Sequence, residues 1–433
     1  MVQYNNLIRV MDNRDYFKKC TILQYLTNRV NLFYSAALTF LFLCGCGGTS
    51  EKHKTQCEAL PFHIMLETAI DNAMPANLTE IGSSISYIQL ETTEKSLLSG
   101  YFEIIRATDS HIAIFDRSGV FMFDISGKFI SKIGNRGSGP GEYTSVSDLH
   151  FSLDGQKVYL MVSGAKCFEY DVNGSFLNSF SLDNPQIQLM MPLADNLFVF
   201  HQRNVLKNVE HSLSISDLQG NITKMYDNHH KITSDRPMSD WQIKPLYSHQ
   251  GNVRFKQRGD RADTLFTVTE KELTPYAIFN LGKYAMPIDI SQPAQRMSYD
   301  ELLLYLGADG KFYVREMKED SDNIYVTLFD YHMLEGFVPR YQYGFFSKHN
   351  CTTKVIGGQG FQNNIDGGLH FFPKFVYGDI LIDYVSAFDL REHVKNSNAA
   401  EMKRRYNNNY DDLVKLANNL EDDSNQIVVL VKK

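Results

Sequence analysis

Residues 120–130 read VFMFDISGKFI, and the same pattern returns as CFEYDVNGSFL at residues 167–177 and as LSISDLQGNIT at residues 213–223. The aspartates of successive copies lie 47 and 46 residues apart. Each copy predicts a strand, an Asp-x-x-Gly turn and a returning strand, because glycine accepts a positive φ and aspartate binds nearby backbone N–H groups. Three copies at nearly constant spacing indicate an internal repeat.

A repeat of this length that carries several strands is typical of a β-propeller blade, in which four strands form a sheet beside a central channel. A β-sandwich would explain the spacing less well. Further strands are expected at 111–116, 157–162, 253–255, 264–269, 311–315, 323–329 and 380–385. The sequence therefore predicts an all-β fold, and a propeller in particular.

The C-terminal part departs from this rhythm. Residues 386–420 are polar and predict two helices, around 388–395 and 399–420, with apolar residues at helical spacing. The run IVVLV at residues 427–431 is too apolar for a free tail. We expect it to complete the blade begun near the N-terminus and so close the ring, which leaves neither terminal blade with an open edge.

The N-terminal part predicts export. The run LFYSAALTFLFL at residues 32–43 holds 12 residues and follows several Lys and Arg side chains. A membrane-spanning helix needs about 20 apolar residues, whereas the core of a signal peptide needs about 7–15. Residues 1–45 are therefore predicted to be a signal peptide.

The sequence LCGCG at residues 43–47 resembles the bacterial lipoprotein box, with Cys44 in a position that usually holds another small residue. The resemblance implies that Cys46 becomes lipidated. Acyl chains hold a protein at a membrane without a spanning segment. We expect residues 46–61 to be a flexible tether and residues 62–433 to be the folded body. The expected location is the cell envelope, on the outer membrane, and the sequence is compatible with either face of that membrane.

The remaining cysteines are Cys57, Cys167 and Cys351. An odd number allows at most one internal disulfide in an oxidising compartment, and no CxxC pair occurs for zinc or redox chemistry. A hydrophobic content of 43% excludes a disordered chain, and a formal net charge of −7 argues against a broad basic face for nucleic acid.

Several motifs resemble parts of binding sites, but ordinary structural roles explain them better. Gly134, Gly137, Gly139 and Gly141 lack the Gly-Lys-Ser/Thr of a phosphate loop, so we expect a tight crossover between blades. Asp124, Asp171 and Asp217 each stand alone in a turn and lack the spacing of calcium ligands in a calcium-binding loop. His229 and His230 are adjacent, so on a strand their side chains would point to opposite faces and could not easily share one metal ion. No HExxH or GxSxG occurs. We predict no metal and no cofactor.

The densest local charge cluster is RFKQRGDRAD at residues 254–263. Placed at a channel mouth, Arg254, Lys256, Arg258 and Arg261 would be candidate ligands for a carboxylate or phosphate. The alternative, a solvated hairpin tip, is the more ordinary explanation of such a cluster.

The segment FISKIGNRGSGPGEY at residues 129–143 resembles the blade boundary of NHL-repeat propellers. From about Phe62 onward the chain resembles six-bladed propeller lipoproteins of Gram-negative bacteria, with further matching pieces at 85–91, 263–266, 364–368 and 420–431. The resemblance implies six blades and brings no substrate or catalytic set.

Two functions remain open. The first is a membrane-tethered, non-catalytic binding or scaffold propeller for a peptide, a glycan or a partner protein. The second is a hydrolase or lyase with a metal or carboxylate site in the central channel, which would require several His, Asp or Glu side chains to gather there.

Overall fold

The computed structural model describes residues 59–433 except residues 164, 183, 195, 205–208, 232–243, 260, 287–297, 299–300, 302–309 and 331–339. All of these belong to one compact unit, which spans residues 54–433. The predicted signal peptide, Cys46 and most of the predicted tether lie outside the described residues, so their roles stay predictions.

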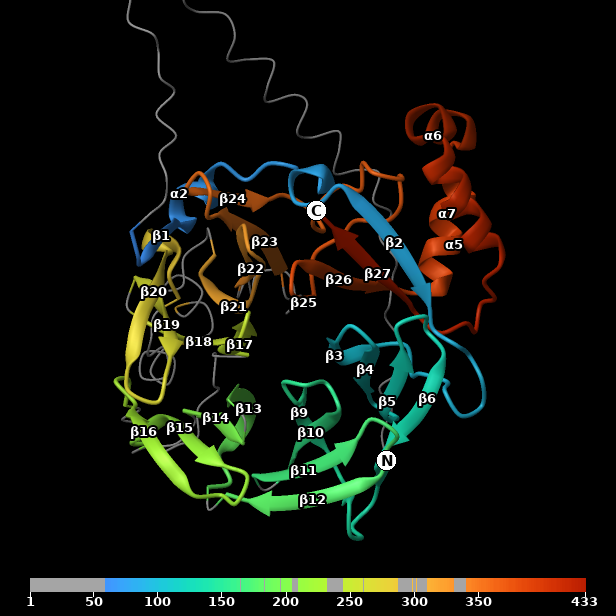
Figure 1. Ribbon diagram of the computed structural model, residues 1–433. Coiled ribbons are helices and arrows are strands. Elements are labelled where there is room, and N and C mark those ends of the chain that lie inside the picture. The colour runs from blue at the N-terminus through green and yellow to red at the C-terminus, as the bar shows by residue number, and fades with distance from the viewer. Residues whose placement is uncertain are drawn as a thin grey trace, which may run out of the picture. The chain divides into compact units, whose positions relative to one another are not determined.

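Six sheets stand around a central channel, which confirms the predicted six-bladed propeller (Figure 1). We number the blades in chain order from the first complete one. Blade 1 holds β3 (Phe102–Ala107), β4 (His111–Asp116), β5 (Gly119–Asp124) and β6 (Phe129–Ile133). Blade 2 holds β9 (Val146–Phe151), β10 (Lys157–Val162), β11 (Lys166–Asp171) and β12 (Phe176–Ser181). Blade 3 holds β13 (Ile187–Ala194), β14 (Leu197–Gln202), β15 (His211–Asp217) and β16 (Ile222–Asp227).

The second half of the ring follows the same plan. Blade 4 holds β17 (Leu246–His249), β18 (Asn252–Gln257), β19 (Ala262–Val268) and β20 (Leu273–Asn280), and β1 (Phe62–Met65) adds to β20 in parallel. Blade 5 holds β21 (Phe312–Glu319), β22 (Asn323–Asp330), β23 (Arg340–Ser347) and β24 (Thr352–Ile356). Blade 6 holds β25 (Phe375–Tyr377), β26 (Ile380–Val385), β27 (Ile427–Lys432) and β2 (Ser84–Gln89).

The Asp-x-x-Gly turns have the predicted geometry. Gly127 and Gly174 have φ of 90°, and Gly220 has φ of 85°. Asp171 Oδ1 accepts hydrogen bonds from the backbone amides two and four residues later, at 3.0 and 2.8 Å, and the aspartates of the other two copies do the same. The repeat therefore marks the hairpin between the third and fourth strands of blades 1 to 3.

The glycine-rich segment is the expected crossover between blades 1 and 2. Within it, β7 (Asn135–Arg136) and β8 (Glu142–Tyr143) form a short parallel pair. Tyr143 fixes the crossover to blade 1, because its hydroxyl donates to the carbonyl of Ile133 at 3.0 Å and accepts from the amide of Val120 at 3.1 Å.

The ring closes as predicted. β27 pairs antiparallel with β2 on one side, where Val429 faces Tyr87, and with β26 on the other, where Val429 faces Asp383. Blade 6 therefore combines strands from both ends of the described chain. Between adjacent blades, apolar side chains such as Met122 of blade 1 and Leu149 and Leu160 of blade 2 are fully buried and form the core.

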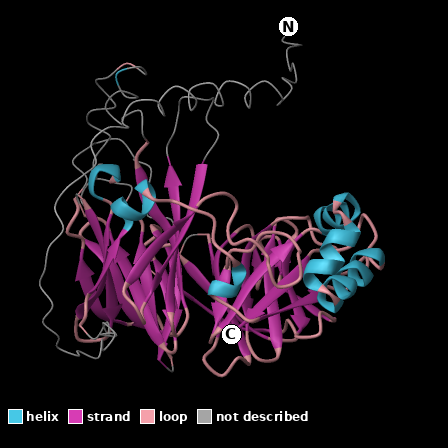
Figure 2. Cartoon of the chain, turned by 90° about the horizontal axis from the view of Figure 1, so that it is seen from above, coloured by secondary structure: helices cyan, strands magenta, loops and turns pink. Residues whose placement is uncertain are grey.

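The helical insertion precedes β27, as expected, but it contains three helices rather than two. They are α5 (Ala387–Asn396), α6 (Ala399–Tyr406) and α7 (Asn408–Asn418), and they lie outside blade 6 (Figure 2). The predicted helix 399–420 is broken at Asn407, where φ is 51° and ψ is −129°. The described residues also form α2 (Leu66–Asp71) and the 3₁₀ turns η1 (Leu78–Glu80) and η2 (Gly282–Tyr284).

Candidate functional site: the central channel

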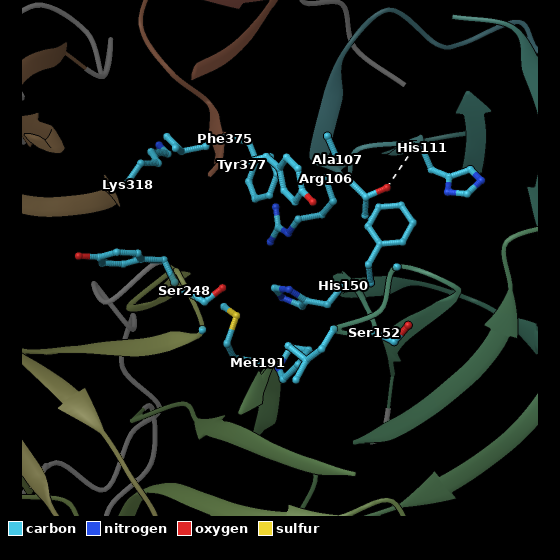
Figure 3. A pocket seen from close by; sticks show the side chains of 18 of the residues that line it. Arg106, Ala107, His111, His150, Ser152, Met191, Ser248, Lys318, Phe375 and Tyr377 are labelled. Atoms are coloured by element: carbon cyan, nitrogen blue, oxygen red, sulfur yellow. Dashed lines mark hydrogen bonds between the residues drawn. The ribbon is translucent and has the colours of Figure 1, made fainter. Parts of the chain in front are cut away.

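The central channel holds a cavity of about 410 Å³. The first strand of every blade contributes to its wall, because these six strands surround the channel (Figure 1). The lining includes Arg106 of β3, His150 of β9, Met191 of β13, Tyr247 of β17, Lys318 of β21 and Phe375 of β25 (Figure 3). Exposed residues of the β3–β4 and β9–β10 hairpins, among them Asp109 and Asp154, form its rim.

Arg106, Asp148 and His150 form one polar cluster at the wall of this cavity. Asp148 and His150 lie two residues apart on β9, so both side chains face the same side of the strand. Asp148 Oδ1 lies 3.2 Å from Arg106 Nη2 and 3.1 Å from His150 Nε2. The contact with His150 lacks hydrogen-bond alignment, because Nε2 has no hydrogen-bond partner.

Burial sets the charge states of this cluster. It lowers the pKa of His150 and favours the neutral ring, and it also lowers the pKa of Arg106. Burial alone would raise the pKa of Asp148, but His150, Arg106 and the backbone amide of Met190 lower it overall. The cluster therefore presents a neutral imidazole beside an ion pair.

Two lysines share a third carboxylate nearby. Glu316 Oε1 lies 3.0 Å from Lys244 Nζ, and Glu316 Oε2 lies 2.7 Å from Lys318 Nζ. Burial opposes ionisation of Glu316, yet the two ammonium groups hold its pKa well below the ordinary value. Lys244 has φ of 50°, a left-handed conformation that is costly for a residue other than glycine and is enriched at functional sites.

Lys374 differs from these paired cations. Within the described residues, its ammonium has no hydrogen-bond or ion-pair partner, although it lies 6.0 Å from the centre of the Tyr343 ring. Part of the Lys374 side chain is accessible, and it lines the channel cavity. Burial opposes its charge, but the field of Asp383 raises the pKa of Lys374 overall. Asp383 itself accepts from the amides of Phe372 and Tyr384 at 3.0 and 2.8 Å.

A second cavity of about 220 Å³ lies toward the end at which β3 begins. Both cavities are lined by Arg106, Lys244, Glu316, Lys318 and Lys374, which we call the charged waist. Within this charged waist, Lys244 and Lys318 share the single carboxylate of Glu316. The linings of the two cavities also include the carboxylates Glu103, Asp109, Asp154 and Glu319 and the cation Arg315.

The predicted basic cluster lies elsewhere, in blade 4. Arg254 and Lys256 are buried within β18, so the expected solvated hairpin tip is wrong for both. Arg254 Nε lies 3.4 Å from Glu319 Oε2, and Lys256 Nζ lies 3.1 Å from Asp263 Oδ2. Arg258 is half-buried and donates to the carbonyl of Met286 at 2.9 Å, whereas Arg261 is exposed. A ligand-binding role for these four residues stays a prediction.

The part of the chain that the structure describes carries neither a metal-ligand cluster nor a membrane-spanning helix. No three His, Cys, Asp or Glu side chains in that part of the chain are grouped as metal ligands. Among the same residues, no helix has the length and apolar character needed to span a bilayer.

The fold has a counterpart among solved structures. A protein from Bacteroides fragilis NCTC 9343, described as a "Putative exported protein", matches 86% of this chain over 100% of its own length, with 18% identity and a TM-score of 0.65. A protein of unknown function from Bacteroides caccae matches 59% of this chain and 86% of its own, with 9% identity and a TM-score of 0.36. The first of these supports the fold.

At the level of sequence, no curated protein matches this chain. A family model described as "Domain of unknown function (DUF4934)" matches residues 61–432, which covers nearly all of the propeller. The chain therefore belongs to the DUF4934 family.

Proposed function

We propose that this protein is a lipid-anchored, non-catalytic binding propeller of the cell envelope, which holds an anionic ligand in its central channel. The observation that carries the proposal is Lys374, a cation that faces the channel without a partner among the described residues. A lysine that lines a cavity beside other cations, with no carboxylate partner of its own among the described residues, suggests that its partner is an anionic ligand.

The surroundings of Lys374 support the same chemistry. Arg106, Lys244 and Lys318 line the same cavity, and their positive field adds to that of Lys374. A cavity of about 410 Å³ falls in the range of small-molecule sites, roughly 300–1,000 Å³. Charge-assisted hydrogen bonds to a carboxylate, phosphate or sulfate are stronger than neutral ones, and they are stronger still away from bulk water.

Three observations support a location in the cell envelope. The lipoprotein-like sequence ends at Cys46, and the similar structure from Bacteroides fragilis is described as exported. Cys351 is disulfide-bonded, and Cys167 is free, so the partner of Cys351 lies outside the described residues. Structural disulfides persist in oxidising compartments and are rare in the cytosol.

Calorimetric titration of the full chain, kept in detergent, tests the anion site. The probes are acetate, glucuronate, phosphate and sulfate, each titrated into wild type, Lys374→Gln and Lys271→Gln. Lys271 lies in an exposed turn of blade 4 and serves as the charge-matched control. We expect one of the anions to bind and Lys374→Gln to weaken it about tenfold or more, with the control unchanged. Absence of binding by all four anions, or equal binding by both variants, would overturn the proposal.

A lyase is the second candidate, because the channel places a neutral imidazole beside Asp148 and Arg106. His150 would remove a proton from the carbon next to a carboxylate, and Arg106 would stabilise the resulting negative charge. The bond from the neighbouring carbon to the linking oxygen would then break as the C=C bond forms, and that oxygen would leave with a proton taken from water. Incubation with a uronate polymer tests it, since β-elimination creates a new C=C bond that absorbs ultraviolet light. Activity that disappears in His150→Ala would favour this function over simple binding.

A further inference from the structure

A groove beside the helical insertion borders on the channel. Its volume is about 790 Å³, and it lies along α5, whose residues Asp389, Glu392, His393 and Asn396 form one wall. The opposite wall includes Gly100, Gln359 and His370. We call this the helix groove. Its polar side chains offer both hydrogen-bond acceptors and donors, beside apolar ones such as Leu369 and Val385.

The helix groove and both channel cavities meet at Lys374. This side chain lines all three hollows, and Tyr384 lines the groove and the smaller channel cavity. Gly100 of the groove is followed directly by Tyr101 of the smaller cavity. A ligand that occupies the groove therefore reaches the unpaired ammonium with its inner end.

Aromatic faces and cations surround the smaller cavity. Tyr101 is 62% exposed and Tyr341 is 39% exposed, although large aromatic side chains are usually buried. Arg315 stands 5.2 Å from the centre of the Phe329 ring and 5.5 Å from that of Tyr341. Exposed flat faces beside cations suit a ligand that combines a ring with an acidic group.

The groove sets a limit on the charge of the rest of the ligand. Asp389 is exposed, and Glu392 faces the groove. Lys395 Nζ lies 2.9 Å from Glu392 Oε1, and the Lys395 side chain is largely exposed. A second acidic group in the groove would meet these carboxylates, whereas hydroxyl groups would donate hydrogen bonds to them. The body of the ligand is therefore expected to be uncharged and rich in hydroxyl groups.

We propose that the ligand is an oligosaccharide with a single acidic sugar at one end, whose carboxylate binds Lys374 and whose ring lies against the tyrosines of the smaller cavity. Neutral sugars would follow along the helix groove. This inference rests on the anion site of the proposed function and names its ligand class. A polyuronate is disfavoured by Asp389 and Glu392.

Four probes test the inference on the full chain by calorimetry: free glucuronate, a neutral trisaccharide, a trisaccharide with one terminal glucuronate, and a trisaccharide of three uronates. We expect the third to bind about tenfold or more tightly than free glucuronate, because it adds contacts in the groove. The triuronate should bind more weakly than the third probe, and Glu392→Gln should narrow that difference.

Tyr341→Ala should weaken the singly acidic trisaccharide about tenfold, and Tyr341→Phe should restore binding because it keeps the ring. Phe388→Ala is the matched control, since Phe388 is a 56% exposed aromatic residue of α5 that does not line the groove. Thermal melting confirms that each variant is folded.

The outcomes separate the two proposals. If no anion binds, the anion site itself is wrong. If glucuronate binds through Lys374 but the trisaccharide binds no better, or if Tyr341→Ala and Phe388→Ala behave alike, only the present inference is overturned. Tighter binding of a peptide carboxylate than of any of the sugars would also overturn it.

Discussion

Arg106 of blade 1 donates a hydrogen bond to Asp148 of blade 2, with 3.2 Å between Nη2 and Oδ1. The other oxygen of Asp148 accepts from the amide of Met190 in blade 3 at 3.1 Å. One buried carboxylate therefore connects three consecutive blades beside the channel. Because hydrogen bonds to buried charges are costly to leave unmade, this connection holds the wall of the cavity in one arrangement.

We predict that Asp148→Asn lowers the free energy of unfolding by about 3 kcal/mol, because the guanidinium of Arg106 is left buried without a counter-charge. Urea denaturation at neutral pH measures the change. Asp154→Asn removes a carboxylate from the exposed rim of the same cavity and should alter stability by less than about 0.5 kcal/mol. Equal effects of the two substitutions would contradict the bridging role of Asp148.

Stability should fall on acidification, and Glu316 should account for part of the fall. Its pKa is lower in the folded protein than in the unfolded chain, where glutamate titrates near about 4.3. Below that pH the unfolded chain binds the proton first, so the stabilisation present above it is lost as the pH drops toward the folded pKa. We expect Glu316→Gln to flatten the dependence of the urea midpoint on pH between about 5 and 3. Glu401→Gln, on exposed α6, should leave the slope unchanged.

The architecture could be predicted because its signals are local and repeated. The Asp-x-x-Gly turns located three blades, and the apolar run at 427–431 located the closing strand. The break at Asn407 was missed because asparagine carries no strong signal for this conformation, while the apolar spacing runs across it.

The channel residues were missed for a different reason. Each blade contributes a few, so they are dispersed along the sequence, and only the ring brings them together. A signal was nevertheless present: Asp148 with His150, and Glu316 with Lys318, are charged or polar pairs two residues apart within strands. The dense cluster around Arg254 instead reflected buried ion pairs within and beside blade 4.

Asn407 between α6 and α7 offers a test of backbone strain. We expect Asn407→Gly to keep or raise stability by up to about 1 kcal/mol, and Asn407→Ala to lower it by about 1 kcal/mol, because a β-carbon disfavours positive φ. Lys415→Gly, on the exposed side of the last turn of α7, should cost up to about 1 kcal/mol. Thermal melting followed by circular dichroism compares the three. A lower melting temperature for Asn407→Gly than for the wild type would contradict the presence of backbone strain at Asn407.

Cys46 can be tested directly as the anchor. We expect the wild-type protein to partition into the detergent phase and Cys46→Ser to remain in the aqueous phase, because two or three acyl chains provide the membrane affinity. Cys44→Ser is the matched control and should partition like the wild type. Mass spectrometry of the N-terminal peptide identifies the modification. Detergent partitioning that survives Cys46→Ser would contradict the assignment.

The closure of blade 6 also determines when this protein can complete its fold. β27 lies between β2 and β26, so the last blade stays incomplete until residues 427–432 are available. Until then, the unclosed ring exposes unpaired strand edges at β2 and β26, which invite aggregation. Pairing of β27 is therefore the final folding step, and it covers both edges at once.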